Sequence, residues 1–151
     1  SERQKEVRLT VCRELLSRYK NKSFLYRIIT SDEKWIYYDN PGRKRSWVSP
    51  GEPAEKSVRR NRFGKKTMLC VWWDQRGVIY HELLKPGETV DTARYQQQLI
   101  DLNRAVKEKR PNWDQVRNRV ILLHDNAPCH TSKPTQETLS ALNWEVLTHP
   151  A

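Results

Sequence analysis

The sequence lacks long apolar runs, paired cysteines and repeats. No stretch approaches the roughly 18 consecutive apolar residues of a membrane-spanning helix, so we expect no membrane partner. The three cysteines, Cys12, Cys70 and Cys129, are odd in number and form no CxxC pair, which argues against a disulfide framework or a zinc finger. Without internal repeats, the 151 residues fit one domain that is large enough for a core.

Basic residues are in excess and unevenly distributed. Lys and Arg number 28 against 18 Asp and Glu, which gives a formal net charge of +10. Residues 43–66 hold nine basic and two acidic side chains, and residues 1–22 hold seven and three. Segregated positive charge favours a polyanion partner, because each phosphate that Lys or Arg neutralises releases condensed counterions. The alternative interpretation is a solvated basic loop that only keeps the protein soluble.

Hydrophobic periodicity predicts alternating helices and strands. We expect helices over residues 3–20, between Asp91 and Pro111, and from Pro134 to Leu142. Strands are expected over residues 24–38, 67–73, 78–84, 120–123 and 144–147. Residues 40–66, rich in Pro, Gly and charge, are predicted to form a long loop with at most a short strand at 45–48. A hairpin followed by strand–helix alternation indicates an α/β fold with a mixed sheet, in the order of an RNase H-like fold.

Two aspartates within predicted strands are candidate metal ligands. Asp32 follows Ile28–Ser31, and Asp125 follows the apolar run 120–123 and a histidine. Burying a carboxylate costs on the order of several kcal/mol unless a charge such as a divalent cation compensates it. On neighbouring strands, the pair can hold Mg²⁺ or Mn²⁺ ions, one activating a water or 3′-hydroxyl and the other stabilising the leaving oxygen. Ordinary turn or cap acids are the alternative.

The segment HDNAPCH, residues 124–130, carries more polar groups around Asp125. Its two histidines and one cysteine permit a zinc interpretation, but zinc usually takes four ligands and the sequence has no second cluster. We favour groups that orient the metal ligands or contact phosphate. These candidates are Glu33, His124, Asn126 and His130.

The basic segment is a candidate nucleic-acid surface. It includes a tryptophan that can stack on an unpaired base, whereas most of the other tryptophans are more simply explained as core. The candidate contact residues are Arg43, Lys44, Arg45, Trp47, Arg59, Arg60, Arg62, Lys65 and Lys66.

Five stretches resemble, in order and spacing, the catalytic domain of mariner transposases. They are SDEKWIYYDNP (31–41), NRFGKKTMLCVWWDQRGVIYHELLKPGETV (61–90), TARYQQQL (92–99), VILLHDNAPCHT (120–131) and LNWEVLTHP (142–150). The resemblance spans essentially the whole chain, and DEKW and HDNAP at this separation are specific. It implies an RNase H-like nuclear enzyme that cuts double-stranded DNA at transposon inverted-repeat ends and joins the 3′-hydroxyl to TA target DNA.

The resemblance also assigns roles. It implies that Asp32 and Asp125 are the first two catalytic, metal-binding carboxylates for two Mg²⁺ or Mn²⁺ ions, with the third beyond Ala151. Residues 1–22 resemble the end of an interdomain linker and the first catalytic-domain helix, and residues 23–151 resemble a catalytic domain truncated before its last helix. Residues 38–65 resemble the clamp loop of the paired-end homodimer.

We therefore expect a fragment of a longer protein, inactive by itself. A non-catalytic DNA-binding or partner-binding module derived from a transposase is the main alternative. A nuclease acting on RNA–DNA hybrids is another.

Overall fold

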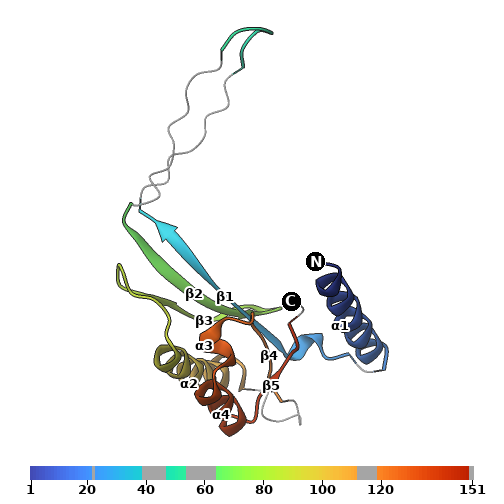
Figure 1. Ribbon diagram of the computed structural model, residues 1–151. Helices are drawn as coiled ribbons and strands as arrows, with labels where there is room; N and C mark the ends of the chain where they lie inside the picture. Colours follow the sequence, from blue (N-terminus) through green and yellow to red (C-terminus); the bar gives the residue numbers. More distant parts are fainter. Residues whose placement is uncertain (22, 39–46, 54–63, 112–118, 150–151) are drawn as a thin grey trace.

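The computed structural model describes residues 1–21, 23–38, 47–53, 64–111 and 119–149. Within them, one sheet carries helices α2 (Thr92–Lys109) and α4 (Lys133–Ala141) packed against each other on one face, while α1 (Glu2–Asn21) lies beside the sheet (Figure 1). The predicted α/β architecture is confirmed. No helix in the described ranges is long and apolar enough to cross a bilayer.

The sheet is mixed, as the sequence predicts. Its strands are β1 (Ile28–Tyr37), β2 (Lys66–Asp74), β3 (Gly77–Leu83), β4 (Ile121–Leu123) and β5 (Glu145–Val146), in the spatial order β3-β2-β1-β4-β5. β1 pairs antiparallel with β2 and parallel with β4. β2 and β3 form the expected hairpin, whose turn reaches Gly77 at φ 117°, a conformation that glycine adopts without strain. The central β1 therefore joins the antiparallel and parallel halves of the sheet.

Helix α2 forms for the reasons that its sequence suggests. The Asp91 carboxylate accepts a hydrogen bond from the Arg94 backbone N–H, which satisfies a donor at the helix start. The predicted apolar stripe faces the sheet, and its four members are buried: Tyr95, Leu99, Leu102 and Val106. They pack on Ile29, Cys70 and Trp72 of β1 and β2 in the main core. This packing fixes α2 beneath the central strands.

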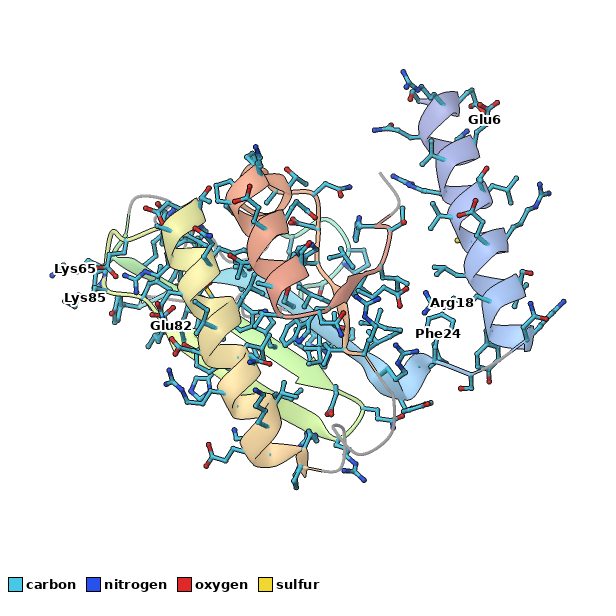
Figure 2. The ribbon with its side chains drawn as sticks, turned by 90° about the horizontal axis from the view of Figure 1, so that it is seen from below. Glu6, Arg18, Phe24, Lys65, Glu82 and Lys85 are labelled. Carbon is cyan, nitrogen blue, oxygen red and sulfur yellow. The ribbon has the colours of Figure 1, made fainter. Side chains whose placement is uncertain are left out.

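Helix α1 is linked to the sheet near its C-terminal end. The Arg18 guanidinium lies 4.2 Å from the centre of the Phe24 ring, and the two side chains lie together in Figure 2. Arg18 also forms a double ion pair with Glu145 of β5. Phe24 packs with Ile121 and Leu147 in a second, smaller core cluster. Charge and apolar contact together hold this end of α1.

Most element predictions are confirmed, with differences at the ends. A 3₁₀ turn, η1 (Leu25–Arg27), occupies the start of the predicted strand 24–38. The short helix α3 (Pro128–Thr131) was not predicted, because four residues are too few to establish a helical repeat. Trp47 and Val48 lie in no strand, which agrees with a loop that was expected to hold at most a short strand at 45–48. Residues 45 and 46 lie outside the described residues.

Candidate functional site

The pairing of β1 with β4 brings the two predicted metal ligands to neighbouring positions. The parallel register aligns Ile28 with Ile121 and Thr30 with Leu123. The same offset, continued by two residues, aligns Asp32 with Asp125. Adjacent strands lie about 4.8 Å apart, so this register directs the chain segments that carry the two aspartates to the same end of the β1–β4 pair.

The expectation that both carboxylates are buried is wrong. Asp32 is exposed, and the Asp125 side chain retains 59 % of its accessible surface. The reason is that β4 stops at Leu123, so Asp125 follows the strand and Asp32 extends past the end of its neighbour. Desolvation therefore gives no argument for a metal here. Only the neighbouring positions of the two acids in the β1–β4 register favour a metal here.

One oxygen of the Asp125 carboxylate is held by the protein. Oδ1 accepts a 3.0 Å hydrogen bond from the Ala127 backbone N–H and lies 2.8 Å from His130 Nδ1. Burial raises the pKa of Asp125, but the hydrogen bond from the Ala127 N–H and the interaction with His130 lower it by more, so the net shift is downward. Asp125 is therefore ionised at neutral pH. Among the described residues, Oδ2 accepts no hydrogen bond from a protein donor.

Asp32 has a simpler environment. Its Oδ1 accepts a 3.0 Å hydrogen bond from the Glu33 backbone N–H, the next residue in the chain. Successive side chains of a strand point to opposite faces, so Asp32 and Glu33 diverge. Glu33 then lies on the face of buried Ser31, and its Oε1 is 3.4 Å from His130 Nε2. The two acids of the DEKW motif thus have different surroundings.

His130 is buried at the centre of this polar cluster. Its ring is 1 % exposed and stacks on the His124 ring, with centroids 4.9 Å apart and planes 5° apart. Burial lowers the pKa of His130, but contacts with Glu33 and Asp125 raise it by more, so the net shift is upward. Its two nitrogens face carboxylate oxygens from different elements.

His124 is buried rather than exposed at the surface. It is 5 % exposed, and its Nδ1 lies 2.7 Å from the Tyr95 hydroxyl. Burial, followed by the charge of His130, lowers the pKa of His124 to about 4, so it is neutral at pH 7. A buried neutral imidazole does not contact DNA phosphate directly. Of the two roles predicted for His124, only positioning is compatible with its burial.

Tyr95 joins this cluster and was missed as a site residue. Its place in the α2 apolar stripe indicates core packing, and the sequence gives no sign that its hydroxyl meets a histidine. The Tyr95 ring centroid also lies 4.1 Å from that of His130. Asn126, by contrast, is exposed, and its side-chain amide donates to the His149 carbonyl at 3.4 Å.

The zinc interpretation is not supported. Within the described ranges, no three His, Cys, Asp or Glu side chains are arranged to hold a metal ion. Cys129 is only half-buried, and burial raises the pKa of its thiol, which disfavours the thiolate that zinc binds. A metal ion held by Asp32 and Asp125 alone would have two protein ligands and would need others to complete its coordination shell.

Only part of the predicted basic surface can be described. Trp47 is 98 % exposed on a segment that lies far from the helices (Figure 1). Lys65 is exposed, whereas Lys66 Nζ lies 4.1 Å from the centre of the Trp35 ring, a cation–π contact that ties it to the sheet. The other candidates lie outside the described residues: Arg43, Lys44, Arg45, Arg59, Arg60 and Arg62.

Comparison with known proteins identifies relatives of the whole chain. The Mariner Mos1 transposase of Drosophila mauritiana is 65 % identical over 151 residues, which cover 100 % of this chain and 44 % of the relative. The histone-lysine N-methyltransferase SETMAR of Homo sapiens is 40 % identical over 151 residues, covering 99 % of this chain and 22 % of the relative. The chain therefore spans less than half the length of either curated relative.

Solved structures agree with this relationship. The Mos1 mariner paired-end complex with Mn matches with a TM-score of 0.92 and 66 % identity, over 100 % of this chain and 44 % of that one. The catalytic domain of Mos1 mariner transposase matches at 0.81 and 57 %, over 100 % and 63 %. The RNase H-like fold is thereby confirmed. Residues 37–116 match the model described as transposase (partial DDE domain), and the chain belongs to this transposase family.

Proposed function

We propose that this chain forms part of the catalytic core of a DNA transposase that cuts transposon inverted-repeat ends and transfers the 3′ end into TA target DNA. The observation that carries the proposal is the β1–β4 register, which brings Asp32 beside Asp125 in a chain 65 % identical to a mariner transposase. Both acids stand at the solvent-exposed end of β4, where a DNA phosphate has access.

The donor chemistry fits Mg²⁺ or Mn²⁺. These hard cations prefer carboxylate oxygens, and Asp125 Oδ2 is not engaged by a described protein donor. Asp32 and Asp125 are the residues that would hold the two ions. The resemblance to mariner transposases implies a further carboxylate after Ala151. Matching Mos1 structures include paired-end complexes with Mn and with Mg, which supports the same two metals here.

Contacts within the chain orient the Asp125 carboxylate in the absence of substrate. When bound, divalent ions polarise the phosphate and lower the pKa of an attacking water or 3′-hydroxyl. The Ala127 N–H and His130 hold Asp125 Oδ1 in a fixed orientation. Such preorganisation matters because ligands that are already oriented need little rearrangement as charge develops on the phosphate.

The substrate and assembly follow from the relatives and the charge. Matching Mos1 structures are paired-end and strand-transfer complexes, which supports double-stranded DNA as the substrate. The basic residues of 43–66, including exposed Lys65, suit its phosphates. We also propose a homodimer with 38–65 as its clamp loop, an interdomain linker ending within residues 1–22 before the catalytic domain, and action in the nucleus.

The experiment is cleavage of inverted-repeat DNA by the full-length protein with Mn²⁺. Asp32→Asn and Asp125→Asn should each abolish nicking while the protein remains folded. Asp101→Asn on α2 is a matched control, because this aspartate pairs with Arg104 at the surface and should retain full activity. Normal nicking by either active-site variant would overturn the proposal.

One observation favours a second candidate, a DNA-binding module without catalysis. The SETMAR match occupies 22 % of a protein named for another activity, so such a domain occurs within a larger protein of a different kind. This candidate predicts salt-dependent DNA binding with no cleavage in Mg²⁺ or Mn²⁺. Cleavage that depends on Asp32 would exclude it.

A further inference from the structure

The contacts of His130 connect two acids that lie far apart in the sequence. Nδ1 lies 2.8 Å from Asp125 Oδ1, and Nε2 lies 3.4 Å from Glu33 Oε1. A carboxylate only accepts hydrogen bonds, so Nδ1 must donate its hydrogen to Asp125. The ring nitrogens thus join β1 to the loop after β4.

The Glu33 end of this connection lies inside the protein. The Glu33 side chain is 17 % exposed, and its buried Oε1 has no hydrogen-bond partner among the described residues. His130 Nε2, which carries a positive charge only when the ring is protonated, lies 3.4 Å from it. A buried carboxylate oxygen is costly unless a positive charge is close. Glu33 therefore attracts the distal nitrogen of His130 and favours the ring orientation that directs Nδ1 to Asp125.

The rest of the cluster restricts the ring. His124 stacks on one side of His130, and Tyr95 packs against it with centroids 4.1 Å apart. Tyr95 also holds His124 through the 2.7 Å contact of its hydroxyl with Nδ1. An imidazole packed in this way, with Nδ1 hydrogen-bonded to Asp125 and Nε2 3.4 Å from the Glu33 carboxylate, has little freedom to rotate. The orientation of Asp125 Oδ1 is therefore set from the core.

We propose that Glu33 is a positioning residue that acts through His130 to orient the Asp125 carboxylate for metal binding. The proposal rests on the function proposed above, because it concerns the same metal site. It assigns Glu33 neither to the metal nor to DNA, although Glu33 is adjacent to Asp32 in the sequence. Histidines and carboxylates behind metal ligands typically alter metal affinity about 10–100-fold when mutated.

The test is Mn²⁺ affinity of the full-length protein, measured from the electron paramagnetic resonance signal of free Mn²⁺. His130→Ala should weaken binding about 10–100-fold, and Glu33→Gln should weaken it by less, within about tenfold. His130→Asn should restore most of the affinity, because the asparagine amide can donate to Asp125 from near the Nδ1 position. This rescue distinguishes orientation of Asp125 from general packing.

Asp101→Asn is the matched control for loss of an acid outside the cluster. Asp101 lies on α2 and pairs with Arg104, so this variant should keep the wild-type Mn²⁺ affinity. If His130→Ala does not fold, Glu33→Gln and His130→Asn still decide the question. Affinity of Glu33→Gln equal to that of the wild type would overturn the role of Glu33.

Asp125→Asn distinguishes failure of the positioning role of Glu33 from failure of the metal site itself. If it loses Mn²⁺ while His130→Ala and Glu33→Gln bind normally, the positioning role fails and the metal site stands. If Asp125→Asn also binds Mn²⁺ as the wild type does, the proposed function fails.

Discussion

Asp74, the last residue of β2, and Asp125, which follows β4, have opposite environments. The Asp74 side chain is 1 % exposed, and Arg110 contacts both of its oxygens, at 2.7 Å through Nε and at 2.9 Å through Nη2. Asp125 is 59 % exposed and has one oxygen engaged, by a backbone N–H and a histidine. An acid saturated by fixed donors stabilises the fold. An acid with a free, accessible oxygen is available to bind a cation.

The largest expected effect is on catalysis. Asp32→Asn and Asp125→Asn should each lower DNA cleavage by the full-length protein about a thousandfold or more, because metal ions contribute several kcal/mol and each 1.36 kcal/mol is about tenfold in rate. For Asp32→Asn, the free energy of unfolding without metal should change by less than about 0.5 kcal/mol, because Asp32 is exposed. Cleavage kinetics and urea unfolding measure the two effects separately. A large stability loss in Asp32→Asn would break the contrast with Asp74.

Asp74→Asn should show the reverse pattern. It leaves the Arg110 guanidinium, 11 % exposed, without its carboxylate. Breaking one partner of a buried ion pair typically costs about 3–5 kcal/mol. Urea unfolding should show this loss, whereas cleavage by the remaining folded protein should be close to normal. A double-mutant cycle with Arg110→Met isolates the pair, and a coupling energy near zero would contradict a structural role.

How far the sequence predicts the fold depends on element length. The α2 helix was predicted correctly because its apolar stripe repeats over about three turns, from Tyr95 to Val106, between a capping aspartate and a proline. The strands β1 to β3 were also identified, with ends one to four residues from those observed. The sequence of the short β4, by contrast, does not show that its pairing with β1 ends at Leu123. For this reason the carboxylates of Asp32 and Asp125 were wrongly expected to be buried.

The site was predictable in part. Asp32 and Asp125 were paired by motif, and the register supports their closeness. The bridge through His130 was not predictable, because it depends on α3, a four-residue helix that sets this ring beneath the sheet. Burial likewise removed His124 from the DNA-contact candidates. The sequence named His130 among the groups that orient the candidate ligands, and its contact with Asp125 agrees with this, but the approach of Glu33 to its other nitrogen was not predicted.

Acid pH should remove the contribution of Asp74 to the free energy of unfolding. Burial raises the pKa of Asp74, but the hydrogen bond from Arg110 and the Arg76 N–H lower it by more, so its folded pKa is below the ordinary 3.8. The unfolded chain then binds the proton first as the pH falls. The stabilisation is complete above about pH 5 and is lost as the pH drops through 3.8 and the folded pKa. Urea unfolding at pH 7, 5 and 3 should show a smaller decline for Asp74→Asn than for the wild type.

The smallest effect is expected at the ion pair of Arg18 and Glu145, which is intermediate in solvent exposure. Arg18 and Glu145 are 35 % and 33 % exposed, so solvent screens their attraction more than that of Asp74 and Arg110. Arg18→Met, which preserves apolar contact with Phe24, should cost about 1 kcal/mol or less in urea unfolding. A loss as large as that of Asp74→Asn would show that solvent exposure does not determine how much each ion pair contributes to the free energy of unfolding.

The most direct test of the account is the position of Mn²⁺ in a crystal of the full-length protein, located by anomalous scattering. The account predicts a Mn²⁺ peak bound by oxygens of both Asp32 and Asp125, at about 2.0–2.3 Å. It also predicts no peak at Asp74, whose oxygens are occupied by Arg110. Carboxylates of Asp32 and Asp125 more than about 10 Å apart, or Mn²⁺ bound without either of them, would contradict it.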